Sequence, residues 1–218
     1  RSLLASCAAA CSLAALPALA KDKDKGAEEP IVIGQSAPFS GPSAQLGNDF
    51  NLGARTYFQQ VNESGGVHGR KIELRVKDDI YDPSVTARNT TEFLEQDQVL
   101  ALLGYVGTST TLAALPIATA AQVPFFAPVT GASALREPFN RYVFNLRASY
   151  FDEADYIFDQ LSVTGTRSIA VFYQDDAYGK AGLDAVQKAK AKRGLQVVAT
   201  APIVRHSTDV SSASKTLQ

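Results

Sequence analysis

Four consecutive hydroxyl residues, Thr108, Ser109, Thr110 and Thr111, follow a glycine-rich turn in this 218-residue chain and precede an alanine-rich apolar segment. The apolar run 99–103 predicts a buried strand, and the segment after the hydroxyls predicts a helix. The first turn of a helix leaves about four backbone N–H groups without partners and carries a partial positive charge. This turn could therefore hold a small anion without any lysine or arginine. The alternative is that the hydroxyls only cap the helix, as Ser and Thr commonly do.

Other polar loops follow the remaining predicted strands, and each begins where a strand ends. In open parallel α/β sheets, ligands bind outside the carboxyl ends of the strands. Because these ends share one edge of the sheet, we expect the loops to converge on a common site. The loops are rich in hydroxyls, glycine or carboxylates, and they comprise residues 36–42, 78–82, 104–109, 127–133 and 174–179.

The acidic residues in these loops do not form a catalytic or metal-binding pattern. Asp175 and Asp176 are predicted to lie in a solvated loop, since carboxylates usually stay in water. Asp78, Asp79 and Asp82 are predicted to make turn and capping contacts, because no histidine accompanies them in the sequence. We therefore expect no metal site among them.

Catalytic and nucleotide-binding motifs are also missing around the hydroxyl-rich turn. No Gly-x-Ser-x-Gly elbow surrounds Ser109, and the isolated His68 and His206 are not placed to act as its base. Neither a Gly-x-Gly-x-x-Gly sequence nor a P-loop follows any predicted strand. The sequence thus predicts a protein that is not an enzyme, has no catalytic residues and uses no cofactor.

The elements that must position these loops alternate between strand and helix, which favours a parallel α/β sheet. Alternation of apolar and charged residues over 71–77 predicts a half-exposed strand near the sheet edge. Asp82 followed by Pro83 predicts the start of a helix that runs to about Gln96. Further strands are expected at 31–34, 99–103, 123–127, 142–146, 168–173 and 195–201, and further helices at 44–62, 108–121, 180–193 and from 149.

The strand and helix rhythm restarts near residues 146–149, which predicts two lobes. We expect an N-terminal lobe over 30–147 and a second lobe over 148–218. The second lobe has only about 70 residues, where a typical domain has 100 or more, so we expect it to be incomplete. The chain stops inside a further helix that begins near Ser207, in keeping with this expectation.

Residues 1–20 resemble an export signal, because they are small and apolar and finish in Ala-Leu-Ala at 18–20. A charged linker is expected at 21–29. Both cysteines, Cys7 and Cys11, lie inside the signal, so no disulfide is expected after it. We expect a periplasmic protein; a lipoprotein anchored at Cys7 is the alternative, because the residues before Cys7 resemble a lipobox. The net charge of −1 gives no reason to expect nucleic acid or a membrane surface as a partner.

Longer motifs carry a resemblance to a known family. The most specific are Ser-Gly-Pro at 40–42, Gly-Gly-Val-x-Gly-Arg-Lys at 65–71 and Asp-x-Tyr-Gly at 176–179. With these motifs in order over nearly all of 30–218, the chain resembles the type I periplasmic solute-binding proteins of the leucine/isoleucine/valine-binding kind. The resemblance implies two α/β lobes joined by three crossings, which close on a ligand like a Venus flytrap. The segments that carry it are 33–47, 61–83, 103–111, 124–136, 142–149 and 169–182.

The resemblance also implies which residues contact the ligand. Thr108 and Ser109 match the positions that hold the carboxylate of an amino-acid ligand, and Val129 and Thr130 match those that meet its ammonium group. Tyr178 matches a second-lobe tyrosine that closes over the ligand. The full set of implied ligand-binding residues is Tyr105, Gly107, Thr108, Ser109, Val129, Thr130, Gly131, Ala132 and Tyr178.

The chain departs from the family pattern near this site. Tyr81 and Gly107 stand where the best-known amino-acid binders carry a cysteine pair, and Leu46 stands where an aromatic residue is frequent. The resemblance implies a monomer that delivers an amino acid, or a related carboxylate or amide, to the permease of an ABC transporter. The alternatives are a ligand-sensing domain for a signalling partner and, with less support, an exported α/β hydrolase.

Overall fold

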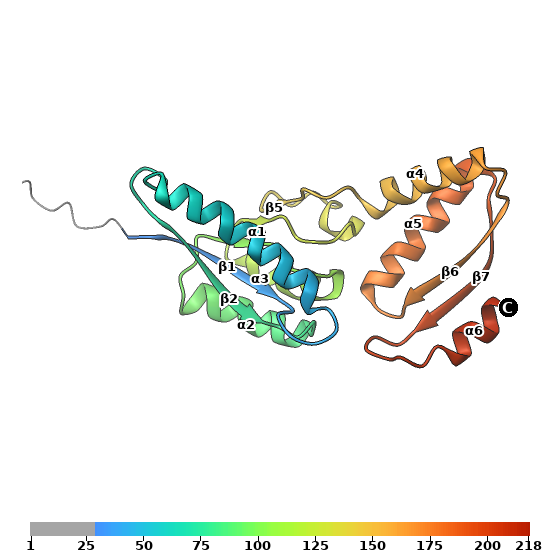
Figure 1. Cartoon of the computed structure of the whole chain (residues 1–218), viewed down its shortest axis with the longest axis horizontal. Coiled ribbons are helices and arrows are strands. Elements are labelled where there is room, and N and C mark those ends of the chain that lie inside the picture. The colour runs from blue at the N-terminus through green and yellow to red at the C-terminus, as the bar shows by residue number, and fades with distance from the viewer. Residues whose placement is uncertain (1–28) are drawn as a thin grey trace, which may run out of the picture.

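The computed structural model describes residues 29–218, so the expected export signal and all but the last residue of the expected linker lie outside the described residues. The first lobe contains β1 to β5 and α1 to α3, and the second contains α4 to α6 with β6 and β7 (Figure 1). The bounds are β1 Ile31–Ala37, α1 Ala44–Glu63, β2 Ile72–Asp78, α2 Pro83–Glu95, β3 Ala101–Leu103, α3 Thr108–Ala120, β4 Phe125–Phe126, the 3-10 turn η1 Ser133–Leu135, β5 Val143–Phe144, α4 Tyr150–Val163, β6 Ser168–Gln174, α5 Ala177–Arg193, β7 Gln196–Ile203 and α6 Ser211–Leu217.

The first lobe is built on a five-stranded sheet in the order β2-β1-β3-β4-β5, and every pair in it is parallel. This confirms the expected α/β class. The alternating segment 71–77 forms most of β2, which is an edge strand as expected. Parallel pairing brings the carboxyl ends of β1 to β4, and the loops that follow them, to the same edge of the sheet.

Helices cover both faces of this sheet. On β1, a Cβ on Gly34 would touch the ring of Phe93 in α2, while the next side chain, Gln35, accepts a hydrogen bond from Asn51 in α1. Since successive strand residues point to opposite faces, α1 and α2 lie on opposite sides of the sheet. The main core lies on the α2 and α3 side, where Phe93, Leu102, Tyr105 and Phe125 are fully buried.

The second lobe pairs β6 with β7 in parallel and packs α4 against α5. Its core contains Phe158 of α4, Ala185 and Ala189 of α5, and Leu195. The segment after β5 runs along one side of the molecule into α4 and joins the two lobes (Figure 1). No helix within residues 29–218 is long and apolar enough to cross a bilayer.

Element boundaries differ from the expected ones in one place that matters for the site. The segment 174–179 was expected to be a loop with a helix from 180, but α5 begins at Ala177 because Asp176 caps it. The side chain of Asp176 accepts hydrogen bonds from the backbone N–H groups of Tyr178 and Gly179. Tyr178 therefore lies in the first turn of a helix, not in a loop.

Candidate functional site

The first turn of α3 is the centre of the candidate site. It begins after Gly107, whose φ of +100° suits glycine, and no side chain of its own segment caps it. The Thr110 and Thr111 hydroxyls do not face a cleft. Both donate to the carbonyl of Gly107, and Thr110 also donates to that of Val106. These two threonines therefore stabilise the turn, and only Thr108 and Ser109 reach beyond it.

Thr108 belongs to a chain of hydroxyls that links the lobes. Its Oγ1 lies 2.6 Å from Oγ1 of Thr130, which in turn donates to the Tyr150 hydroxyl at 3.2 Å. The backbone N–H of Ala132 also donates to Thr130 Oγ1, at 3.2 Å. Thr108 and Thr130 are buried in the first lobe, and Tyr150 begins the first helix of the second.

The loop after β4 is fixed beside α3 by its backbone. Val129 donates its N–H to the carbonyl of Tyr105 at 2.8 Å and pairs with Val106 in an isolated parallel bridge. The carbonyl of Gly131 accepts the N–H of Tyr150 at 2.8 Å. The loop therefore touches both the start of α3 and the start of α4.

Ser109 makes a direct contact across the lobes. Its hydroxyl donates to Oδ2 of Asp176 at 2.8 Å, and the Gln174 amide donates to the same oxygen at 2.6 Å. The prediction that Asp175 and Asp176 lie in a solvated loop therefore holds for Asp175, which is exposed and pairs with Lys180. It is wrong for Asp176, whose side chain is only 12% exposed because it caps α5 and meets Ser109.

Tyr81 lies at the same boundary. A Cβ on Gly107 would come within 2.4 Å of the Tyr81 ring, so glycine is required for this close approach. Arg205, which follows β7, donates to the Tyr81 carbonyl at 3.4 Å, and its guanidinium lies 5.8 Å from the ring centroid. Burial and the nearby charge of Asp176 raise the pKa of Tyr81 to about 12, so the phenol stays neutral at physiological pH. The two positions that depart from the cysteine-bearing pattern thus pack against each other.

Three carboxylates next to Tyr81 in the sequence, those of Asp78, Asp79 and Asp82, have the turn and capping roles that the sequence predicts. Asp82 caps α2 through the N–H groups of Ser84 and Val85. Asp78 accepts hydrogen bonds from Phe39 and Ile80 N–H groups. Asp79 is fully buried and accepts hydrogen bonds from the Ser36 and Thr86 hydroxyls and the Tyr81 N–H. Within residues 29–218, no group of three or more His, Cys, Asp and Glu side chains could hold a metal ion.

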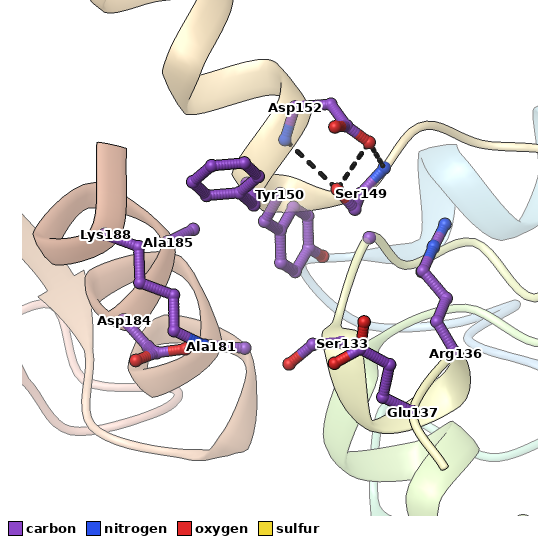
Figure 2. A pocket seen from close by; sticks show the side chains of 12 residues that line it. Ser133, Arg136, Glu137, Ser149, Tyr150, Asp152, Ala181, Asp184, Ala185 and Lys188 are labelled. Carbon is purple, nitrogen blue, oxygen red and sulfur yellow. Dashed lines mark hydrogen bonds and ion pairs between the residues drawn. The ribbon is translucent and has the colours of Figure 1, made fainter. Parts of the chain in front are cut away.

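A cavity of about 420 Å³ opens beside Tyr150, between the lobes (Figure 2). Gly131, Ser133, Arg136 and Glu137 line it from the first lobe. The start of α4 and one face of α5 line it from the second. Figure 2 shows the capping box at the start of α4, where Ser149 and Asp152 bond to each other through side chain and backbone. Both charge signs are represented in the lining, by Arg136 and Lys188 and by Glu137, Asp152 and Asp184.

The structure gathers most of the expected site residues at this boundary. Tyr178 is 44% exposed, and its ring meets that of Tyr150 edge to face at 5.8 Å. The Tyr105 side chain points away from the others, because its ring packs on Phe125 in the core and its hydroxyl pairs with Thr90. The expected residues that come together through contacts of their side chains or backbone are Gly107, Thr108, Ser109, Val129, Thr130, Gly131 and Ala132.

Residues outside the expected ligand contacts also contribute to this boundary. Tyr150, Asp176 and Arg205 all contact the first lobe, and none was among the expected ligand contacts. The Asp-x-Tyr-Gly motif held a signal for Asp176, since Asp is a favoured N-cap residue. Nothing in the sequence marks Arg205.

Comparison with known proteins places the chain in a family. A family model described as a periplasmic binding protein matches residues 30–218. An "Amino acid binding protein" of Pseudomonas aeruginosa is 25% identical over 186 residues, which cover 84% of this chain and 49% of that protein. The chain spans about half the length of the curated relatives that it matches over most of its own length.

Two solved structures share both fold and sequence with the chain. A substrate-binding periplasmic protein from Ralstonia solanacearum matches with a TM-score of 0.80 and 34% identity, over 86% of this chain and 53% of that one. A possible leucine/isoleucine/valine-binding protein from Rhodopirellula baltica matches with a TM-score of 0.80 and 32% identity, over 85% and 51%.

Proposed function

The chain belongs to the periplasmic binding protein family, a family of binding proteins and not of enzymes, and from this premise we propose that it captures a small solute between its lobes for an ABC transporter. The observation that carries the proposal is the first turn of α3, which lies at the lobe boundary without a capping side chain of its own. The protein acts outside the cytoplasm and hands its ligand to a membrane permease.

We propose an amino acid or a related small carboxylate as the ligand. The N–H groups at the start of α3, with the hydroxyls of Thr108 and Ser109, provide donors for a carboxylate. The carbonyls of the loop after β4, around Val129 and Thr130, provide acceptors for an ammonium group. The name of the Pseudomonas aeruginosa relative agrees with this class. Of the expected ligand contacts, Gly131 also lines the cavity of about 420 Å³ beside Tyr150, whose volume is in the size range of small-molecule sites.

Ligand capture follows from the position of the site between two bodies. A ligand that touches Thr108 and Thr130 on one lobe and Tyr178 on the other binds the closed form better than the open form. This differential affinity shifts the population toward the closed form, in which the permease recognises the protein. No covalent step is involved.

Thermal-shift screening of the purified protein against amino acids, small carboxylates and amides tests the proposal. A cognate ligand at 100 times its dissociation constant should stabilise the fold by about 2.7 kcal/mol. If no compound of these classes raises the melting temperature, the proposed ligand class is wrong.

The substitution Thr108→Val tests the carboxylate position. Valine keeps the shape of threonine but removes the hydroxyl, so ligand binding measured by calorimetry should weaken by at least about 1 kcal/mol. Thr91→Val is the matched control, because the Thr91 hydroxyl bonds only to the Ala87 carbonyl within α2. If the two variants bind the ligand with equal affinity, the Thr108 hydroxyl does not contact the ligand.

A further inference from the structure

We propose that Asp176 is a positioning residue that latches the two lobes through Ser109 before any ligand arrives. The inference rests on the proposed function, since it concerns how the same cleft closes. It adds a contact that the protein makes with itself at the place where a ligand anion is expected.

Asp176 serves two helices with one carboxylate. Through Oδ1 it accepts the N–H groups of Tyr178 at 2.9 Å and Gly179 at 3.2 Å, which caps its own helix, α5. Through Oδ2 it accepts the hydroxyl of Ser109 at 2.8 Å, in the first turn of α3 on the other lobe. The carboxylate therefore bridges the starts of α3 and α5.

Electrostatics favour this arrangement. Each helix start carries a partial positive charge, so two helix starts that face each other repel unless a negative charge lies between them. Gly107 precedes α3 and has no side chain with which to cap it. Asp176 supplies the missing negative charge from the opposite lobe, at a position where its side chain is only 12% exposed. Hydrogen bonds to an ionised group in such surroundings are stronger than those between neutral groups.

A second arm of the latch crosses the boundary next to the first. Arg205 Nη1 lies 3.9 Å from Asp176 Oδ2, and the same nitrogen donates to the Tyr81 carbonyl on the first lobe. The Tyr81 ring packs against Gly107, directly before α3. Both arms thus link the first lobe to the second. On the first lobe they involve the start of α3 and the loop that carries Tyr81, and on the second they involve the segments that follow β6 and β7.

The latch has a direct consequence for ligand binding. A ligand carboxylate that reaches the first turn of α3 must share the Ser109 hydroxyl with Asp176 or take it from Asp176. The Thr108 hydroxyl is not involved in the latch, because it pairs with Thr130. Ser109 therefore serves lobe closure first, and a ligand carboxylate must compete with Asp176 for its hydroxyl.

The test measures lobe closure without ligand. Spin labels on Gln45→Cys in α1 and Ala191→Cys in α5, with Cys7 and Cys11 replaced by serine, report the distance between the lobes. In ligand-free protein, Ser109→Ala and Asp176→Asn should each lower the ratio of closed to open molecules about tenfold, the effect of losing one charge-assisted hydrogen bond. The double variant should show no further loss, and Ser109→Thr, which keeps the hydroxyl, should restore the closed form.

Two control variants separate the latch from general helix effects. Ser84→Ala removes a serine at the same position of α2 as Ser109 occupies in α3, and Asp209→Asn alters a carboxylate that contacts only the start of its own helix, α6. Both should leave the distance distribution unchanged. The inference is overturned if wild-type protein without ligand is as open as the Ser109→Ala variant, or if the two single effects add in the double variant. Because no ligand is present, this result is independent of the ligand screen.

Discussion

Among single side chains, Asp79 shows most clearly how burial changes chemistry near the site. Its carboxyl is fully buried beneath the loop that carries Tyr81, and this burial raises its pKa from 3.8 to about 6. The folded state therefore binds the proton more tightly than the unfolded state. The contribution of this carboxyl to the free energy of unfolding is therefore largest below about pH 4. It is lost as the pH rises toward 6, because the buried carboxyl must then ionise.

The substitution Asp79→Asn tests this dependence. An amide can keep the hydrogen bond to the Tyr81 N–H and never ionises, so the variant should lose less stability than wild type between pH 4 and pH 7. The expected difference is about 2 kcal/mol, from a shift of about two pKa units. Thermal melts over this range measure it. Asp78→Asn should act in the opposite sense and at lower pH, because the Asp78 pKa is lowered from 3.8 and the stability it contributes is lost only as the pH falls below about 4. Parallel stability curves for Asp79→Asn and wild type would contradict the argument.

Side-chain chemistry at the start of α3 could be predicted from the sequence, but side-chain direction could not. The hydroxyls at 108–111 lie in the first turn of a helix, as expected, yet two of them bond backward to the turn itself. Tyr105 is adjacent to the site in sequence, yet its ring points into the core, where it packs edge to face on Phe125. Burial of a neighbouring side chain depends on tertiary packing, which one sequence does not reveal.

Among the elements, the turn into α3 depends on Gly107. Its φ is +100°, and a Cβ would lie 2.4 Å from the Tyr81 ring. Gly107→Ala should therefore destabilise the protein by about 2 kcal/mol or more, from backbone strain and displacement of Tyr81. Urea unfolding measures the free energy.

Gly182 in α5 offers a matched comparison. Gly182 lies inside the helix, and a Cβ there would meet nothing within 4 Å. Gly182→Ala should stabilise the protein by about 0.5 to 1 kcal/mol, since alanine has the higher helix propensity. Equal effects of the two alanines would show that neither φ nor the Tyr81 contact matters.

The elements themselves were predicted well wherever the sequence pattern was long. The helix after Asp82 runs over Pro83–Glu95 with Asp82 as its cap, as expected. The sequence predicts the start of α5 three residues too late, at 180, because a solvated Asp176 would not cap the helix that in fact begins at Ala177. The strands β4 and β5 are only two residues long, shorter than the expected 123–127 and 142–146.

At the scale of the whole molecule, Arg136 restrains the segment that joins the two lobes. Its guanidinium donates to the carbonyl of Ala132 at 3.0 Å and to that of Arg147, which immediately precedes the second lobe. Arg136→Met should speed hydrogen exchange at the Tyr150 N–H about tenfold, since that N–H bonds to Gly131 across the same joint.

Arg141→Met is the control for this measurement, because Arg141 is exposed and contacts the ring of Tyr142. Exchange at Tyr150 should be the same as in wild type. If Arg136→Met also leaves it unchanged, the guanidinium does not restrain the joint.

The relation between the lobes is the part that the sequence could not predict. The restart of the strand and helix rhythm predicts two bodies, but the contacts between them join residues far apart in the chain, such as Ser109 with Asp176 and Tyr81 with Arg205. Each of these side chains has an ordinary local interpretation as a cap, a turn or a surface residue. Only their juxtaposition in space gives them a shared role.

The position of Tyr81 between the lobes has an optical consequence. The chain contains eight tyrosines and no tryptophan, so its near-ultraviolet emission comes from tyrosine alone. One of these fluorophores is pressed between Gly107 and the Arg205 guanidinium. Separation of the lobes would expose that phenol to water and to soluble quenchers, whereas the fully buried Tyr105 would stay protected from them. The protein thus carries a built-in, label-free spectroscopic reporter of its own opening.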